Sequence, residues 1–551
     1  MSNLSPPQKK CIFDIMKRLP LGKQHFELFF REDLLYVDKT PIIYKLIDGV
    51  GYYFLSRPRR FGKSLLVDTL KNIFLGKQEL FKGLWIYDKI DWKVHPVIHL
   101  DFSVLEYEGL GLSVALMESL DKIANSYSLQ LTKETSKGKL SELIEVLSEK
   151  APVAILIDEY DKPITDYITD LAKANENRET LREFYGALKA LGDKIQLLFI
   201  TGIAKFSRVS LFSVLNHLTD ISLNEEFATI CGITHEELVA NFEPYLERAE
   251  KKLKLPREAV LEQIKKMYNG YSWDGENFVY NPFSLLNFLN EQRFRSYWFK
   301  TGTPSFLIEL LRQKKIDAKQ VESLQVEDTF FDSFNIEWGI AIEPLLFQTG
   351  YWTIKKIEYD NYFPIYTLTY PNLEVRRAFL HNLLEIYTYK PETTINSVTL
   401  KIRKALNSKD IEALEDQLNI LFSDISSHLF PFEKKAPDEE RVTKEFLAWE
   451  GYFQTIIYIV LQYIGIYIKC EVSKHKGRLD AVVEVPNYIY IMEFKLEDAE
   501  AALQQIKDQQ YHHSYQNSSK EILLLGIAFD QKNRMIKKIE QEVWDKKLNL
   551  G

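Results

Sequence analysis

Four short apolar runs within residues 52–202 constrain the fold most, because amphipathic segments of helical spacing separate them. The runs are YYFLS, PVIHLDFS, PVAILIDEY and IQLLFITG. Strands that alternate with helices join into a mostly parallel sheet, since each parallel connection needs a crossover. The sequence therefore predicts an α/β domain over residues 10–225.

The first run leads into the pattern of a phosphate-binding loop. In FLSRPRRFGKSLLVDTL, an apolar strand precedes Gly62, Lys63 and Ser64, and a helical pattern follows. Gly62 permits close backbone approach, Lys63 can reach the β- and γ-phosphates, and Ser64 can ligate Mg²⁺. Arg57 stands where the usual pattern has its first glycine. A strand, a turn and a helix with basic surface residues would be the alternative interpretation.

Two later runs end in residue types that suit ATP chemistry. Asp158 is expected to hold the metal, Glu159 to activate the attacking water, and Thr201 to sense the γ-phosphate. Strands often end in acids for solubility, but three strands ending in the expected types in this order predict ATP binding with hydrolysis. Lys205 and Arg208 are candidates for contacting the γ-phosphate. The full set of expected nucleotide contacts is Arg60, Phe61, Gly62, Lys63, Ser64, Leu65, Asp158 and Thr201.

The C-terminal stretch GRLDAVVEVPNYIYIMEFK predicts a hairpin with charged residues on one face. If Pro486-Asn487 is a two-residue turn, Asp480 lies opposite Glu493, and Lys495 points to the same side. Pro-Asn is not a favoured hairpin turn, and a slip of one residue would reverse the faces. Two close carboxylates repel, so a divalent cation such as Mg²⁺ is expected between them, with Lys495 orienting a water. The alternative interpretation is an edge strand whose charged residues have no catalytic role.

Charge and cysteine content limit the classes of partner and location. The formal net charge is −8, so a nucleic-acid partner requires a local basic patch. Three widely separated cysteines and no apolar leader favour a reducing, cytoplasmic location. The most apolar stretch, 456–468, is too short to span a bilayer and is expected to be a helix running into a strand, so no membrane partner is expected. The candidate patch is Lys469, Lys474, Lys476 and Arg478, with a solvated loop as the alternative.

Two further blocks follow the first domain. Residues 230–430 show a largely helical pattern, and 428–445 is the best linker candidate. Residues 435–545 predict an order of α-β-β-β-α-β.

Several motifs make the chain recognisable. They include YVDKT, YFLSRPRRFGKSLL, LIDEYDKP, FITGIAKFS, YNGY, YWFKTGTPSFL and LLFQTGYWTI. With them the chain resembles the AAA-ATPase-like family, whose members often carry a C-terminal PD-(D/E)XK nuclease-superfamily domain. The resemblance covers nearly the whole chain. It implies an AAA-like P-loop NTPase domain with a parallel sheet at 10–225, a helical lid or linker at 230–430, and an α/β restriction-endonuclease-like domain at 435–545.

The resemblance also assigns residues in the C-terminal domain. Asp480 matches the first acid of the nuclease motif, Glu493 the second and Lys495 the lysine. Gln505 and Tyr511 match the following helix, but they lie about 240° apart around it, so only Gln505 is expected in the site. Glu471 and, more weakly, Glu450 are further candidate acids.

The implied function is ATP binding coupled to metal-dependent phosphodiester cleavage of DNA or RNA. ATP and Mg²⁺, with Mn²⁺ as a substitute, are the expected cofactors. Nucleic acid is the expected partner, together with a homo-oligomer formed through the ATPase module. The alternative is a nucleotide-dependent switch or scaffold whose nuclease fold binds nucleic acid or protein without cleavage. A motor or chaperone ATPase would leave the C-terminal residues unexplained.

Overall fold

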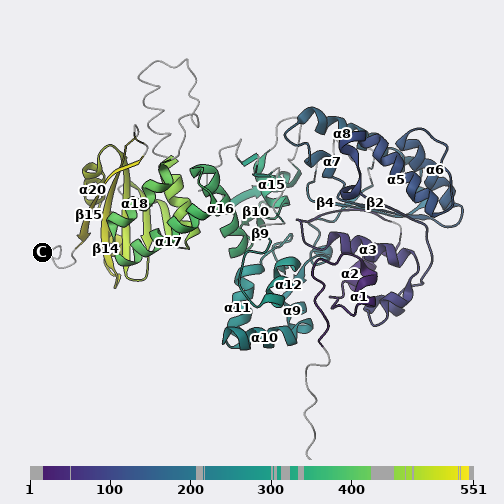
Figure 1. Cartoon of the computed structure of the whole chain (residues 1–551), viewed down its shortest axis with the longest axis horizontal. Coiled ribbons are helices and arrows are strands. Elements are labelled where there is room, and N and C mark those ends of the chain that lie inside the picture. The colour runs from purple at the N-terminus through teal and green to yellow at the C-terminus, as the bar shows by residue number, and fades with distance from the viewer. Residues whose placement is uncertain are drawn as a thin grey trace, which may run out of the picture. The chain divides into compact units, whose positions relative to one another are not determined.

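The computed structural model describes residues 16–49, 51–205, 215, 217–298, 302, 307–308, 310–311, 323–332, 341–423, 452–465, 467–474, 477–530, 533 and 535–544, with the backbone alone for 467–474 and 477–480. The chain divides into two compact units (Figure 1). The first is Met1–Leu310 with Ser323–Val375, and the second is Leu311–Glu322 with Arg376–Gly551. The block expected at 230–430 is thus shared between both units, and the expected domain limits stay predictions.

A five-stranded parallel sheet forms the centre of the first unit. Its order is β2-β3-β4-β1-β5, and all neighbours pair in parallel, which confirms the predicted sheet. Every residue of β3 is buried, as expected of a parallel strand covered on both faces. The strands are β1 Gly51–Ser56, β2 Val97–Asp101, β3 Val153–Asp158, β4 Ile195–Gly202 and β5 Thr219–Asp220.

Helices cover both faces of this sheet. Figure 1 shows α1, α2 and α3 on one side, and α5 to α8 on the other. The apolar sides of α3 and α6 pack on β3 through residues such as Val67 and Leu143, which are fully buried. The helices are α1 Phe26–Arg31, α2 Thr40–Ile47, α3 Lys63–Phe74, α5 Leu112–Ser126, α6 Ser136–Ser148, α7 Lys162–Thr165 and α8 Leu171–Tyr185.

A helical group follows and has a core of its own. Leu238, Leu246, Ile264 and Leu285 are buried together there, and Leu35 of the N-terminal segment joins them. The N-terminal segment therefore packs on helices about 200 residues later in the chain. These helices are α9 His235–Asn241, α10 Glu243–Leu253, α11 Arg257–Tyr268 and α12 Pro282–Glu291.

The first unit also contains a small antiparallel sheet that the sequence analysis did not identify. Its order is β8-β10-β9, with strands β8 Ser323–Glu327, β9 Thr353–Asp360 and β10 Phe363–Thr369. The turn between β9 and β10 is Asn361-Tyr362, and both residues have positive φ. A turn of this type usually carries glycine at its second position, so the sequence lacked the signal that marks a hairpin.

The second unit holds a mixed sheet between helical layers. The order is β11-β12-β13-β14-β15, and only β13 and β14 run in parallel, joined by the crossover through α20. Residues 452–463 form the preceding helix, which confirms the predicted helix before a strand and the order α-β-β-β-α-β, with β15 added. The strands and helix are β11 Tyr467–Lys474, β12 Gly477–Glu484, β13 Tyr488–Leu496, α20 Ala499–Asp508, β14 Glu521–Asp530 and β15 Met535–Trp544.

Two helices upstream of the expected domain pack on this sheet. They are α17 Glu392–Ser408 and α18 Ile411–Phe422. The Tyr490 hydroxyl of β13 donates to the Leu406 carbonyl of α17 at 2.7 Å. In the described part of the chain, no helix is long and apolar enough to cross a membrane.

Candidate functional site

The phosphate loop joins β1 to α3 with the backbone geometry that its sequence predicts. Gly62 caps α3 with φ +91°, a left-handed conformation that glycine adopts without a steric penalty. Arg60 is also left-handed, at φ +69°. The free N–H groups of the first turn of α3 therefore face the loop and favour an anion there.

Lys63 is held inside the loop. Its side chain is only 6% exposed, and Nζ donates to the carbonyls of Arg57 at 2.9 Å and Pro58 at 3.1 Å. Both partners are neutral, so no carboxylate competes with a phosphate for this ammonium group in the loop itself.

Arg57 occupies the position of the first glycine in the phosphate-loop pattern, and its contacts stabilise the loop there. The guanidinium group is fully buried and donates to the carbonyls of Ser56 at 2.9 Å, Ser222 at 2.7 Å and Phe227 at 3.2 Å. Its carbon lies 3.9 Å from the centre of the Trp273 ring, a cation–π contact. Burial lowers the pKa of Arg57 to about 10. This arginine supports the start of the loop and is not among the residues that line the cavity there.

The structure brings Asp158 to Ser64 and Lys63. Asp158 ends β3 and is 3% exposed, and burial raises its pKa to about 6. The hydrogen bond from Ser64 and the charge of Lys63 act in the opposite direction. A carboxylate and a hydroxyl oxygen at this spot are donors that Mg²⁺ accepts. Asp101 of β2 lies beside Asp158 in the strand register.

Glu159 lies next to this pair in a strained conformation. Its φ is +51°, which costs a non-glycine residue about 1 kcal/mol, and its half-buried side chain lines a cavity at the phosphate loop. Backbone strain of this kind concentrates at functional sites.

Asp161 is a buried acid that the sequence analysis missed. Its carboxylate accepts the backbone N–H of Ala204 at 2.8 Å and that of Ile203 at 3.1 Å. Burial raises its pKa to about 6. The bonds tie the segment after β3 to the end of β4. LIDEYDKP contains this second acid, but nothing in the pattern separates its role from that of Asp158.

The structure does not bring Thr201 or Lys205 to the cavity that begins at the phosphate loop. The Thr201 hydroxyl is fully buried and donates to the Leu55 carbonyl of β1 at 2.9 Å. Lys205 forms an ion pair with Asp220 at 2.8 Å, and neither residue lines the cavity. Arg208 lies outside the described residues.

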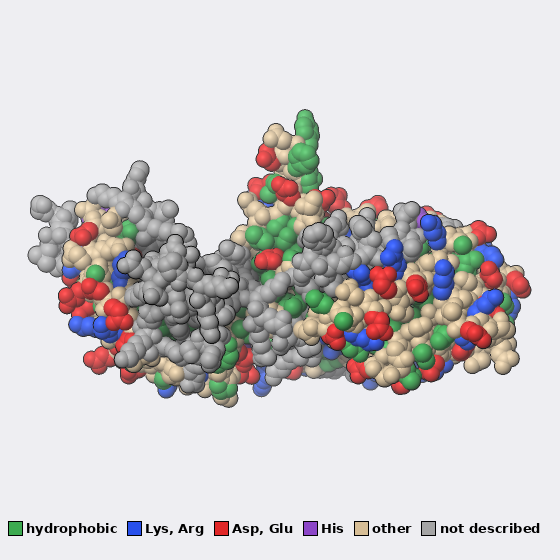
Figure 2. Space-filling view, turned by 90° about the horizontal axis from the view of Figure 1, so that it is seen from above, with side chains coloured by type: hydrophobic (Ala, Val, Ile, Leu, Met, Phe, Trp, Pro, Cys, Tyr) green, Lys and Arg blue, Asp and Glu red, His purple; other side chains and the backbone are tan. Residues whose placement is uncertain are grey.

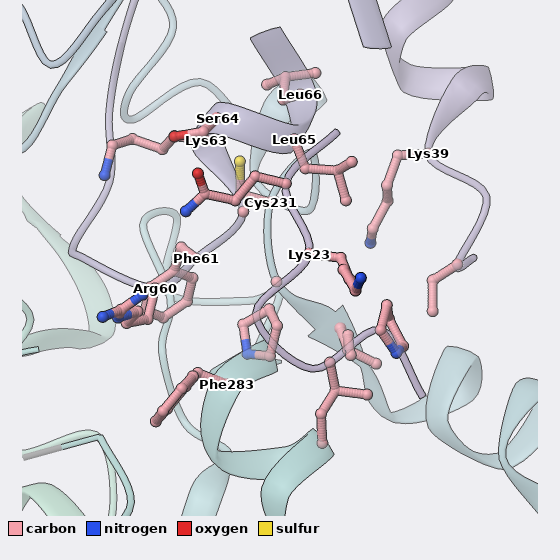
Figure 3. Close-up of a pocket in the computed structure, with 18 of the residues that line it drawn as sticks. Lys23, Lys39, Arg60, Phe61, Lys63, Ser64, Leu65, Leu66, Cys231 and Phe283 are labelled. Atoms are coloured by element: carbon pink, nitrogen blue, oxygen red, sulfur yellow. The ribbon is translucent and has the colours of Figure 1, made fainter. Parts of the chain in front are cut away.

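A cavity of about 390 Å³ extends from the phosphate loop to the N-terminal segment and the helical group. Figure 3 shows Lys23 and Lys39 across this pocket from Lys63 and Ser64. Apart from these two lysines the far end is largely apolar, and Cys231 lines the cavity near Lys63. The volume suits a nucleotide-sized ligand. The lining includes Arg60, Phe61, Gly62, Lys63, Ser64, Leu65, Glu159, Phe29, Leu35, Val37, Ile233, Phe242, Phe283 and Leu286.

Lys39 connects this cavity to the helical group. Its Nζ lies 2.7 Å from both carboxylate oxygens of Glu237. Glu237 also completes the capping box of α9 with Thr234. The YVDKT motif contains this lysine, but its partner lies 198 residues later, so sequence spacing gave no sign of the pair.

In the second unit, the hairpin has the predicted register. Ala481 pairs with Met492 and Val483 with Tyr490, and Val485 and Tyr488 close the turn. One further step in this register sets the backbone of Asp480 opposite Glu493. The Asp480 side chain lies outside the described residues, so the carboxylate pair stays a prediction.

Glu493 and Gln505 meet as expected. Glu493 is 3% exposed, and the Gln505 amide of α20 donates to its Oε1. Lys495 follows two residues later on the same face of β13 and is half-buried. Tyr511 packs in the core with Ile491 and Ile506.

Gly526 is a positioning residue that the sequence analysis missed. It pairs with Glu493 in the β13–β14 register. A Cβ atom there would lie 2.2 Å from the Ala499 carbonyl oxygen and 2.5 Å from the Leu503 nitrogen. Only glycine lets α20 cross the sheet this closely, beside the carboxylate that Gln505 binds. A glycine inside a strand was the available signal.

Other expected contributors remain untested. The side chains of Glu471 and of the basic patch, and all of Glu450, lie outside the described residues. Among described side chains, no three of His, Cys, Asp or Glu gather as a metal site would require. On the face in Figure 2, basic and acidic side chains are interspersed over the described surface.

Comparison with known proteins matches both regions. A family model described as a predicted AAA-ATPase matches residues 20–212, and a model of the PD-(D/E)XK nuclease superfamily matches residues 448–539. A protein of Azotobacter chroococcum mcd 1, described as an uncharacterised protein in the vnfD 5′ region, is 34% identical over 530 residues. That alignment covers 94% of this chain and 98% of the relative. No solved structure matches the chain.

Proposed function

The chain belongs to the AAA-ATPase-like family with a C-terminal PD-(D/E)XK nuclease-superfamily domain, and from this premise we propose that it is a nucleotide-controlled nuclease. In this proposal the first unit binds and hydrolyses ATP, and the second cleaves phosphodiester bonds of DNA or RNA. The observation that carries the nucleotide part is the convergence of Asp158 with Lys63 and Ser64, since these last two line a cavity of suitable size.

In the nucleotide site, each residue has a stated task. Lys63 exchanges its two carbonyl partners for the β- and γ-phosphates, which bind an ammonium group more strongly than neutral acceptors do. Ser64 and Asp158 hold Mg²⁺, and Glu159 accepts a proton from the attacking water. The apolar end of the cavity takes the base.

In the nuclease site, Asp480 and Glu493 hold the metal ion, and Lys495 orients the attacking water. Gln505 fixes the Glu493 carboxylate through its amide. When bound, Mg²⁺ or Mn²⁺ lowers the pKa of a water ligand and stabilises the charge that develops on the phosphate. The donor set fits such an ion, since Glu493 supplies a buried carboxylate that a side-chain amide orients.

A cleavage assay on mixed DNA and RNA tests the proposal. It uses Mg²⁺ or Mn²⁺, with and without ATP. Lys495→Ala is the blank, and Lys520→Ala is the matched control, because Lys520 lies in the same unit and pairs with Glu484 at 2.8 Å. We expect metal-dependent cutting by the wild type and the control alone. Equal cutting by all three proteins would overturn the assigned site.

A nucleotide-dependent switch that binds nucleic acid without cutting is the second candidate. The burial of Glu493 and its bond to Gln505 favour it, because a carboxylate engaged in this way can serve the scaffold alone. ATP would then change nucleic-acid affinity, while neither metal would support cleavage. Self-association through the ATPase module belongs to both proposals, and sedimentation with and without ATP measures it.

A further inference from the structure

The phosphate loop is packed against aromatic residues that the proposed chemistry does not use. The Phe61 ring meets Tyr271 edge-on, with ring centres 4.7 Å apart, and Trp273 at 5.5 Å. Pro58 lies so close to Gly350 that a Cβ atom there would meet its ring at 2.8 Å. Tyr271 ends the motif YNGY, and Gly350 belongs to LLFQTGYWTI. These contacts therefore support the phosphate loop.

Trp298 supplies a directed bond within this support. Its indole N–H donates to the carbonyl of Arg59 in the loop at 3.3 Å. The side chain is fully buried and meets the Tyr351 ring edge-on at 5.3 Å. The Trp298 backbone N–H donates to the Glu374 carboxylate at 2.8 Å, and that of Tyr297 donates to the same oxygen.

Glu374 is almost completely buried, which is uncommon for a glutamate. It is 1% exposed, and its described partners are backbone N–H groups rather than a lysine or an arginine. Burial raises its pKa to about 7, against the N–H bonds and the nearby Ser284 hydroxyl. The phenols of Tyr268, Tyr271 and Tyr297 lie near enough for its charge to raise their pKa values. Burying a carboxylate costs several kcal/mol, so a role beyond filling space is expected.

Glu374 lies in the first turn of α16, Leu373–Thr388. The start of this helix is fixed as well. Asn372 accepts the N–H of Val375 at 3.1 Å and donates to the Asn269 carbonyl at 2.9 Å. Gly270 leaves no room for a Cβ atom against the Pro371 carbonyl oxygen, at 2.0 Å. The larger segment of the second compact unit, Arg376–Gly551, begins within the same helix.

We infer that Trp298 and Glu374 are positioning residues that hold the phosphate loop, through the Arg59 carbonyl, to the start of α16. The inference rests on the proposed nucleotide site and adds its regulation. Phosphate binding at the loop changes the position of the Arg59 carbonyl. The Trp298 indole and the Glu374 carboxylate carry that change to the helix that continues into the second unit.

Trp298→Phe tests the loop end of this link. The substitution keeps an aromatic ring and removes the N–H. Trp92→Phe is the matched control, because its indole also donates to a backbone carbonyl, that of Tyr87 at 2.9 Å, away from the loop. We expect about fivefold weaker ATP binding for Trp298→Phe, which corresponds to about 1 kcal/mol. Both variants should show similar small losses of thermal stability.

Glu374→Ala and Glu374→Gln test the helix end. Alanine removes the acceptor, whereas the glutamine carbonyl restores it, so ATP affinity should fall for alanine and recover for glutamine. Glu392→Ala is the control, since Glu392 is an exposed first-turn glutamate of the next helix. A loss that glutamine does not restore would overturn the role of the acceptor.

Amide hydrogen exchange tests the connection to α16. ATP should change exchange in residues 376–388 of the wild type, and Trp298→Phe should reduce that change at saturating ATP. A wild type that binds ATP without any change there overturns the inference. A wild type that binds no ATP overturns the proposed function instead, so the two failures are distinct.

Discussion

The phosphate loop and the C-terminal hairpin are each built around a buried carboxylate, but the two carboxylates have different neighbours. Asp158 lies near Lys63 and accepts a hydrogen bond from Ser64. Glu493 accepts from the neutral amide of Gln505, and its lysine, Lys495, is only half-buried. The charge of Lys63 lowers the pKa of Asp158, but burial outweighs it and raises that pKa to about 6. The first carboxylate therefore has a lysine and a hydroxyl group beside it, whereas the second has a hydrogen bond from a side-chain amide.

The two sites also differ in how far apart their residues lie in the chain. Lys63 and Asp158 meet because parallel strands end at the same edge of a sheet. Their support then comes from Trp298 and Glu374, far later in the sequence. The described hairpin site uses one hairpin, the next helix and the strand that follows it, which holds Gly526. Distant substitutions should therefore affect the first site and leave the second unchanged.

Lys63→Ala should have the largest effect of the substitutions considered, and it should affect ATP binding at the first site alone. It removes the only loop ammonium group that can reach the phosphates, so ATP affinity should fall at least 100-fold, or by about 3 kcal/mol. Isothermal titration measures it, with Lys71→Ala in the last turn of α3 as the control. Nuclease activity without nucleotide should persist. A parallel loss of that activity would show that the two sites are not separate.

Glu493→Gln should affect the hairpin site and leave the nucleotide site unchanged. The exchange keeps the shape and removes the charge that a metal ion needs, so cleavage should fall about 100-fold while ATP binding is unchanged. Glu484→Gln, on the neighbouring strand of the same hairpin, is the control. Gel assays measure cleavage and titration measures ATP. Full cleavage by Glu493→Gln would contradict the view that this carboxylate serves a metal ion.

Gly526→Ala should weaken the second unit and spare the first. The added methyl group overlaps the backbone of α20, and such overpacking costs about 2 kcal/mol. Chemical unfolding followed separately for the two units measures this. Gly109→Ala is the control, because its Cβ would meet open space. Unchanged stability of the second unit would mean that α20 is free to shift away from Glu493.

The sequence predicted what depends on strand period and order. Alternation and an assumed turn at Pro486-Asn487 were enough for the hairpin register, and the apolar runs were enough for the parallel sheet. Contacts between segments that lie far apart in the chain could not be predicted, because no sequence pattern indicates them. The bracing role of Arg57 depends on Ser222 and Trp273, and the pairing of Lys39 depends on Glu237. Such partners become visible only when the fold brings them together.

Asp161→Asn should have the smallest effect, and it concerns the first unit alone. Burial raises the folded-state pKa of Asp161 from 3.8 to about 6. Between these values the folded chain binds a proton that the unfolded chain has released, so the free energy of unfolding falls as pH rises from about 4 to about 6. Each such group changes the free energy of unfolding by at most about 1.4 kcal/mol per pH unit.

Denaturant unfolding at several pH values measures this effect. The free energy of unfolding should fall less steeply with pH for Asp161→Asn than for the wild type. Asp193→Asn, at an exposed position, is the control and should keep the wild-type slope. An unchanged slope for Asp161→Asn would mean that the N–H bonds from Ile203 and Ala204 offset the effect of burial on the pKa of Asp161.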